Sequence, residues 1–209
     1  MEEATYTEKY KGLDIEIYHS EIDESPNDWG NEDVFLVGFH RQFTVEREGF
    51  EIDICRELAE VEEKSEEAKE IAKKYHFFGL EAYIHSGVAL ALSNEGNFVD
   101  RQWDVSQLGL VFVDKAETKS RAKAKKIAQG LIETWNDYLS GNVYGYMVKE
   151  AEASCWGFYG DYETSGILDE AKSEIDDYVK AKKDKHFKTR KAQIRNNVAL
   201  DKRQTLSVG

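Results

Sequence analysis

The sequence predicts an α+β protein with a mostly antiparallel sheet of about seven strands and three helices. Short apolar runs recur at hairpin-like spacings, which predicts paired strands. Three longer stretches carry apolar residues three and four positions apart, which predicts amphipathic helices. Strands and helices do not alternate strictly, so a parallel doubly wound sheet is disfavoured. We therefore predict one acidic α+β domain over residues 1–181 and a basic C-terminal tail over residues 182–209.

The predicted strands differ in how many of their faces are buried. Residues 13–19, LDIEIYH, alternate apolar and polar side chains, as a strand with one buried face does. Residues 34–40, VFLVGFH, and residues 108–114, LGLVFVD, are almost wholly apolar and predict buried strands. Hairpins are expected over residues 79–92 and residues 142–160.

Three helices are expected, each with an apolar stripe that faces the sheet. They are predicted over residues 56–75, residues 117–139 and residues 166–182. Gly141 is a suitable stop for the second helix, and Ser165 is a candidate N-cap for the third.

The charge of the chain is unevenly distributed along the sequence. The net charge is −13, yet residues 182–203 carry nine Lys/Arg and two Asp, so the rest of the chain carries −20. A strongly negative body repels phosphate backbones, which makes nucleic acid an improbable partner for the body and favours a protein partner with a basic surface. The tail itself either touches phosphate or folds back on the body, and we expect neutralisation within the molecule.

Several function classes are disfavoured by what the sequence lacks. No apolar run reaches the roughly 18 residues that a membrane-spanning helix needs, and the N-terminal residues do not resemble a signal peptide. Two cysteines without CxxC spacing suit a reducing compartment, so we expect a cytoplasmic protein without membrane attachment. Without HExxH, GxSxG or a His/Cys cluster, we expect no cofactor, no metal and no catalytic residue.

The stretch SCWGFYGDY, residues 154–162, places Trp156, Phe158, Tyr159 and Tyr162 beside glycines. Exposed aromatic residues beside glycines are typical of surfaces on which nucleic-acid bases stack. The acidic neighbourhood argues against stacking, so we favour a core strand whose aromatic side chains pack against helices. A single-strand nucleic-acid binder remains a third alternative for this chain.

A second set of residues would serve a small-ligand or nucleotide-binding enzyme. Its members are polar or nucleophilic residues near predicted strand ends, with one aromatic neighbour: His85, Asp104, Ser106, Cys155 and Trp156. Loops at strand ends are a common location for site residues. The simpler interpretation is that the Asp and Ser stabilise a turn, while the Cys is a small buried side chain.

Acidic residues crowd the first long loop and the first predicted helix. The candidate binding surface consists of Glu21, Asp23, Glu24 and Asp28 in the loop, with Glu57, Glu60, Glu63 and Glu67 in the helix. Solvated helix faces are often acidic, and nearby lysines pair with them locally. The sharper hypothesis is that these carboxylates imitate DNA phosphates and occupy a basic groove of another protein.

Three motifs together carry a resemblance to a known family. They are W-D-x-S-Q-x-G at residues 103–109, Y-L-x-G-x-V-Y-G-Y at residues 138–146 and S-C-W-G-F-Y-G at residues 154–160. In this order they resemble an uncharacterised family of small proteins from bacteriophages and mobile elements, although Ala199 stands where that family would have proline. The resemblance implies a phage context and supplies no catalytic residue.

The leading hypothesis combines this context with the charge. We expect a non-enzymatic phage accessory protein that acts in the host cytoplasm, binding a host protein and inhibiting a defence or nucleic-acid enzyme. The alternative is the enzyme described above. The sequence predicts neither the identity of the partner nor the oligomeric state.

Overall fold

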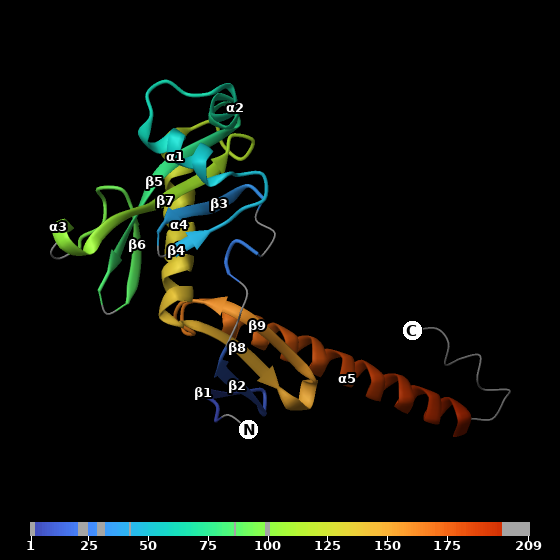
Figure 1. Cartoon of the computed structure of the whole chain (residues 1–209). Coiled ribbons are helices and arrows are strands. Elements are labelled where there is room, and N and C mark those ends of the chain that lie inside the picture. The colour runs from blue at the N-terminus through green and yellow to red at the C-terminus, as the bar shows by residue number, and fades with distance from the viewer. Residues whose placement is uncertain are drawn as a thin grey trace. The chain divides into compact units, whose positions relative to one another are not determined.

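A computed structural model of the chain describes residues 3–20, 25–28, 32–41, 43–85, 87–98 and 101–197 (Figure 1). The chain divides into two compact units: unit 1 comprises residues 1–19, 144–158 and 162–209, and unit 2 comprises residues 20–143 and 159–161. Each is built on an antiparallel sheet with helices packed against it, so the predicted α+β class is confirmed.

Unit 2 contains a five-stranded antiparallel sheet with strand order β4-β3-β7-β5-β6. Its strands are β3 (Val34–His40), β4 (Phe43–Val45), β5 (Tyr75–Ile84), β6 (Val88–Leu92) and β7 (Val105–Asp114). The apolar runs that predicted buried strands therefore form β3 and β7, which lie side by side in the sheet. The predicted hairpin is formed by β5 and β6.

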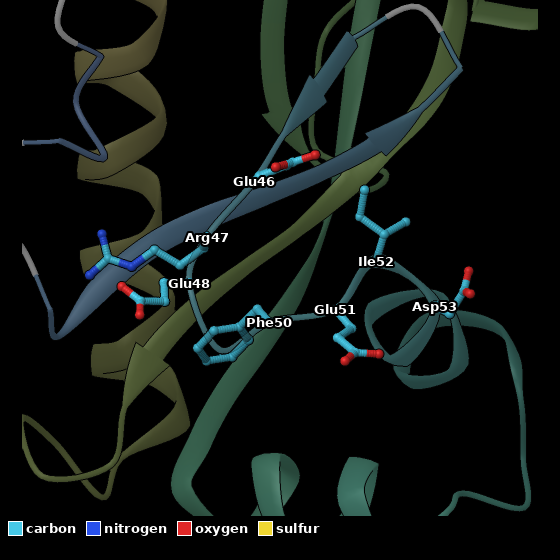
Figure 2. A pocket seen from close by; sticks show the side chains of 7 residues that line it. All are labelled: Glu46, Arg47, Glu48, Phe50, Glu51, Ile52 and Asp53. Atoms are coloured by element: carbon cyan, nitrogen blue, oxygen red, sulfur yellow. The ribbon is translucent and has the colours of Figure 1, made fainter.

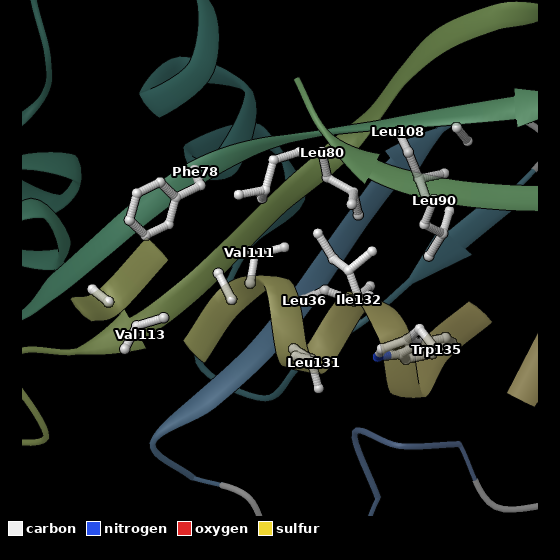
Figure 3. Packing of buried hydrophobic residues seen from close by; sticks show 14 residues of the cluster. Leu36, Phe78, Leu80, Leu90, Leu108, Val111, Val113, Leu131, Ile132 and Trp135 are labelled. Carbon is white, nitrogen blue, oxygen red and sulfur yellow. The ribbon is translucent and has the colours of Figure 1, made fainter. Parts of the chain in front are cut away.

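Helices cover both faces of this sheet. The helices of unit 2 are α1 (Ile52–Glu60), α2 (Glu66–Lys74), α3 (Arg101–Asp104) and α4 (Arg121–Ser140). Odd and even positions of the central strand serve different cores: Val111 packs with α4, as Figure 3 shows, whereas Phe112 packs with α1 and α2. Burial on both faces explains why β7 has no polar alternation, because side chains on either side must be apolar.

The first predicted helix is wrong in one respect: residues 56–75 form two helices instead of one. α1 ends at Glu60, and α2 begins at Glu66. Ser65 starts the second helix because its hydroxyl accepts a hydrogen bond from the backbone NH of Ala68 at 3.2 Å. The periodicity alone concealed this break, since Leu58 and Ala68 both face the same core.

The strands β3 and β7 approach each other closely at a pair of glycines. Gly38 lies opposite Gly109 in the register of the two strands. A Cβ atom placed on Gly109 would collide with the backbone carbonyl of Val37. Only a residue without a side chain permits this spacing, so Gly109 is required by packing between backbones.

Unit 1 contains a four-stranded antiparallel sheet with order β1-β2-β8-β9 and one long helix. Its elements are β1 (Tyr6–Tyr10), β2 (Leu13–His19), β8 (Val143–Val148), the 3-10 helix η1 (Lys149–Ala151), β9 (Ala153–Tyr159) and α5 (Ile167–Asn197). Ile15 and Ile17 of β2 pack with Ala171 and Ile175 of α5. Leu13 also packs against this core, whereas the alternate residues Asp14, Glu16 and Tyr18 face the other side of the sheet, as the sequence alternation predicted.

The described residues contain nine strands and five α-helices, more than the seven strands and three helices expected. β1 was missed because it is a short edge strand with few buried side chains. α5 runs to Asn197 and not to residue 182, since no glycine or proline interrupts it. The single domain over residues 1–181 stays a prediction, because two compact units can unfold as one.

We predict that Gly109→Ala lowers the free energy of unfolding by at least about 2 kcal/mol, because overpacking here displaces backbone. Gly130→Ala in α4 is the matched control: nothing lies within 4 Å of its added Cβ, and it replaces glycine inside a helix. That control is expected to stabilise the protein by about 0.5–1 kcal/mol. Urea unfolding of both variants tests this, and equal stabilities would contradict the close approach.

Candidate functional site

The outer side of the α1–α2 face carries a large excess of negative charge. We define the acidic layer as residues 46–70, which contain 11 Asp/Glu and four Lys/Arg. Inward side chains such as Cys55, Leu58 and Ala68 pack on the sheet, so the charged side chains of α1 and α2 point outward. The apolar side chains of these helices are buried in the core, so the surface they leave exposed is formed mainly by acidic side chains.

Of the four acidic residues predicted in the first loop, only Asp28 lies within the described residues. Glu21, Asp23 and Glu24 lie outside the described residues. Asp28 accepts hydrogen bonds from the backbone NH of Ser25 at 2.8 Å and from its hydroxyl at 2.7 Å. These bonds hold the pKa of Asp28 below its usual value, and they give this carboxylate a role in the turn.

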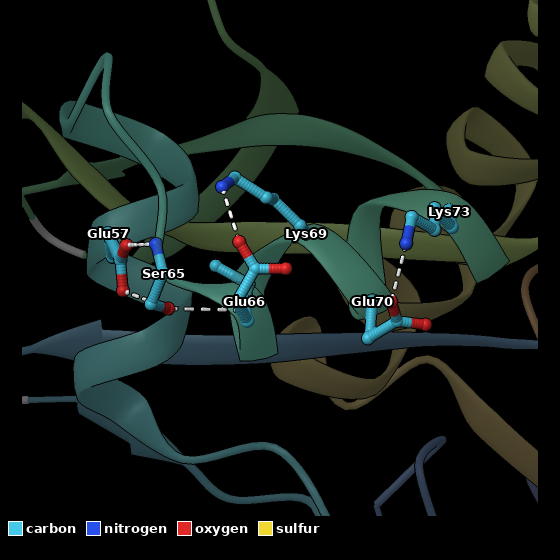
Figure 4. A network of polar contacts seen from close by, with 7 residues as sticks. Glu57, Ser65, Glu66, Lys69, Glu70 and Lys73 are labelled. Atoms are coloured by element: carbon cyan, nitrogen blue, oxygen red, sulfur yellow. Dashed lines mark hydrogen bonds and ion pairs between the residues drawn. The ribbon is translucent and has the colours of Figure 1, made fainter.

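Glu57 belongs to the acidic layer but is occupied by contacts inside it. One carboxylate oxygen accepts a hydrogen bond from the backbone NH of Ser65, and the other accepts from its hydroxyl at 2.9 Å (Figure 4). Both hydrogen bonds favour the charged form and lower the pKa of Glu57. Glu57 thus joins α1 to the start of α2 and has little capacity left for a partner.

Two lysines of α2 neutralise two glutamates of the same helix, at the helical spacing that the sequence suggested. Lys69 pairs with Glu66 at 2.7 Å, and Lys73 pairs with Glu70 at 2.5 Å, as Figure 4 shows. Pairs as exposed as these contribute little to stability. They reduce the net charge of the layer without removing it.

The predicted residues Glu60, Glu63 and Glu67 remain exposed on the layer. Among the residues that the structure describes, none of these three takes part in an ion pair. Val61 lies between two of them in the sequence, and 46% of its surface is exposed. This group combines uncompensated carboxylates with an apolar side chain, a composition suited to contact with another protein.

A surface pocket lies where the acidic layer begins. It is lined by Glu46, Arg47, Glu48, Phe50, Glu51, Ile52 and Asp53. The Arg47 side chain donates to the backbone oxygen of Asn27 at 2.9 Å and covers the Phe35 ring, so it belongs to the fold. Figure 2 shows the four carboxylates pointing in different directions, which adds negative surface without forming a convergent ligand site.

The five residues of the enzyme alternative are not brought together in either unit. His85, Asp104 and Ser106 belong to unit 2, whereas Cys155 and Trp156 belong to unit 1. The imidazole of His85 lies 3.6 Å from the Asp104 carboxylate. Ser106 lies on β7 opposite Ala82 of β5, within the sheet.

The two cysteines are free thiols without an activating environment. Burial raises the pKa of Cys55 to about 11. Burial also raises the pKa of Cys155, and the nearby Glu170 carboxylate raises it further. Because the thiolate is the reactive form, both side chains are poor nucleophiles at neutral pH.

The aromatic stretch of β9 is divided between two faces of the unit 1 sheet. Phe158 packs into the core beneath α5, where its ring lies 6.1 Å from that of Tyr146. Trp156 lies over Gly145 on the opposite face, 47% exposed and 6.3 Å from the ring of Tyr18. The positive φ of 88° at Gly157 interrupts the strand alternation between them. The core interpretation therefore holds for Phe158 and fails for Trp156.

A buried ion pair in unit 2 escaped the sequence analysis. Glu81 of β5 is 6% exposed, and its carboxylate accepts from Arg101 at 2.6 and 2.9 Å and from the backbone NH groups of Asn94 and Gly96. Burial alone would raise the pKa of Glu81, yet these hydrogen bonds outweigh it and the pKa is lowered. A single glutamate inside the apolar run GLEAYI was the signal that could have indicated it.

Over the described ranges, no three His, Cys, Asp or Glu side chains are placed to hold a metal ion. No described helix has both the length and the apolar character needed to cross a bilayer.

Comparisons with known proteins found no matching family model, no matching curated protein and no matching solved structure.

We predict that Glu81→Gln lowers the free energy of unfolding by about 2 kcal/mol near pH 7, because it breaks a buried charge pair. A lowered pKa stabilises the fold above the unfolded value of about 4.3 and loses that effect as pH falls through the folded pKa. The difference between wild type and variant should therefore shrink below about pH 4.

Urea unfolding at pH 7 and pH 3 measures this difference. Glu66→Gln, which breaks an exposed pair, is the control and should change stability by less than about 0.5 kcal/mol at both pH values. A difference for Glu81→Gln that is independent of pH would contradict the assigned role of its charge.

Proposed function

We propose that this chain is a non-enzymatic accessory protein whose acidic layer binds a basic surface of a host protein. The observation that carries the proposal is the excess of carboxylates over residues 46–70, with Glu60, Glu63 and Glu67 exposed. Unit 2 as a whole has 26 Asp/Glu and 14 Lys/Arg, so its field extends the attraction beyond the layer.

The kind of partner follows from the chemistry of the layer. Glu60 and Glu67 lie on α1 and α2, and Glu63 lies in the connection between these helices. Together they present a row of negative charge, as phosphates do along a nucleic acid. A basic groove that evolved for phosphates would accept them, so we propose a nucleic-acid enzyme or a defence protein as the partner. Val61 would add an apolar contact at the centre of the charged group.

The proposed setting is a bacterial cytoplasm during phage infection. The resemblance of three motifs to a phage family supports this setting, and two free cysteines suit a reducing compartment. Inhibition would result from occupancy of the groove, which requires no catalytic group on this chain.

The proposal predicts a partner that binds the full chain from bacterial lysate and elutes with salt. Glu60→Gln, Glu63→Gln and Glu67→Gln combined should weaken the purified partner's affinity by roughly tenfold, because three interface charges are lost. Isothermal titration calorimetry with the purified partner, at two salt concentrations, measures this loss.

The matched control removes three exposed carboxylates elsewhere, by Glu117→Gln, Glu133→Gln and Glu150→Gln combined. It removes the same amount of negative charge, so it should leave affinity within about twofold of wild type if the layer is the contact. A partner that binds both triple variants equally well, or one that nucleic acid fails to displace, would refute the proposal.

A further inference from the structure

The C-terminal half of α5 extends away from the rest of unit 1. The last buried contacts of the helix are those of Ile175 and the half-buried Val179, and every residue from 180 to 197 is exposed. We call residues 180–197 the projecting half of α5. It is about 27 Å long at 1.5 Å per residue, and Figure 1 shows it continuing past the strands of its sheet.

The charge of the projecting half is almost entirely positive. It contains eight Lys/Arg and a single acidic residue, Asp184. Among described residues, no ion pair involves any of these eight side chains, although Lys182 lies 5.5 Å from the Tyr178 ring. A favourable interaction with the helix dipole is confined to the last turn, so it accounts for Arg195 and not for the other basic residues. The remaining basic side chains therefore have no ion-pair partner among the described residues.

The basic residues are arranged around an exposed apolar ridge. Phe187 is 70% exposed and Ile194 is 50% exposed, and their spacing of seven residues puts them on one side of the helix. Lys183 and Lys191 lie four residues before and after Phe187, and Arg190 lies between the two apolar residues along the same side. Lys182 and Lys185 point to the opposite side. We call this side the front of the projecting half; it is basic and has an apolar centre.

We infer that the projecting half of α5 binds duplex DNA by lying in the major groove. A straight helix of about 10–12 Å diameter fits a groove about 12 Å wide, whose two walls are rows of phosphates. Basic residues on both flanks of the ridge would meet those walls, while Phe187 and Ile194 would face base edges such as thymine methyl groups. Because its evidence comes from unit 1 alone, this inference does not rest on the proposed function.

Two other polyanionic surfaces fit the arrangement less well. A bilayer surface would gain little from two apolar side chains in 18 residues, since interfacial helices carry a continuous apolar face. In the acidic layer of a second copy, the four carboxylates of the pocket point in different directions, so they do not present two parallel rows of negative charge to the helix. A groove lined on both sides by phosphates can pair with the basic residues beside the ridge and, at the same time, contact the apolar side chains of the ridge.

The acidic remainder of unit 1 does not prevent this binding. The end of the helix lies about 27 Å beyond the last packed residues, which is roughly three Debye lengths at physiological salt. Repulsion between those acidic residues and the DNA is therefore screened along most of the projecting half. The negative charge elsewhere in the molecule limits affinity and makes binding strongly dependent on salt.

The test measures binding of the full chain to a fluorescent 20-base-pair DNA duplex by anisotropy between 50 and 200 mM NaCl. The projecting half has six basic residues besides Lys182 and Lys185. If these six contact phosphates, the affinity should fall by about 10³-fold across this range. The front variant, Lys183→Gln with Lys191→Gln, should reduce the slope of log affinity against log salt by about 2. It should also weaken binding by more than roughly tenfold at 100 mM salt.

The matched control is Lys182→Gln with Lys185→Gln, which removes two lysines from the opposite side of the same helix. It should retain wild-type affinity within about threefold, since these residues face away from the DNA. Far-UV circular dichroism checks that both variants keep their helix, and glutamine has a helix propensity close to that of lysine. Equal losses of DNA affinity in the two variants would overturn the proposed orientation of the helix in the groove.

Two parallel measurements distinguish the other surfaces. Flotation with vesicles containing phosphatidylserine tests a bilayer, and sedimentation velocity at 50 mM salt tests self-association. Binding to vesicles or to a second copy that depends on Lys183 and Lys191, without binding to the duplex, would overturn the inference. Binding to DNA that exceeds binding to an RNA duplex of the same sequence would support it, because the RNA major groove is too narrow for a helix.

Discussion

The constraint on which unit 2 depends is the burial of its five-stranded sheet on both faces. Alternate residues of β7 enter two different cores, so neither face of the central strands can hold a charge without a partner. Two buried acidic residues of these strands have partners: Glu81 accepts four hydrogen bonds, and Asp114 accepts one from the backbone NH of Ala116 and pairs with Lys74. Charged residues of unit 2 consequently lie mainly on the outer sides of the helices and in the loops between the elements. The acidic layer is a consequence of this confinement as well as of composition.

Opposite charges are collected on separate helices. The layer formed around α1 and α2 is negative, whereas the projecting half of α5 is positive. Few of these charges are paired among the described residues: three acidic residues of the layer pair with a nearby Lys or Arg, and no ion pair involves the basic residues of the projecting half. Both surfaces are therefore suited to external partners of opposite charge. The neutralisation within the molecule that the sequence suggested finds no support in α5, whose basic residues are exposed in a continuous helix.

In β9, one glycine determines on which face of the sheet its aromatic neighbours lie. Gly157 takes a left-handed conformation, and Trp156 and Phe158 consequently lie on opposite faces of the sheet. Gly145 leaves space for the exposed indole ring on the neighbouring strand. A simple period of two would have placed both aromatic side chains on the same face. The sequence motif is thus partly core and partly surface.

The sequence by itself determined the α+β class, the strands β2, β3 and β7, and the end of α4 at Gly141, because these depend on local periodicity and turn chemistry. It also identified Glu60, Glu63 and Glu67 as acidic surface residues. Only the tertiary structure decided that Glu57 is occupied by Ser65, that Glu81 meets Arg101, and that α5 continues beyond its packed half. The physical reason is that pairing partners and burial depend on residues far apart in the chain, whereas periodicity reports only on neighbours.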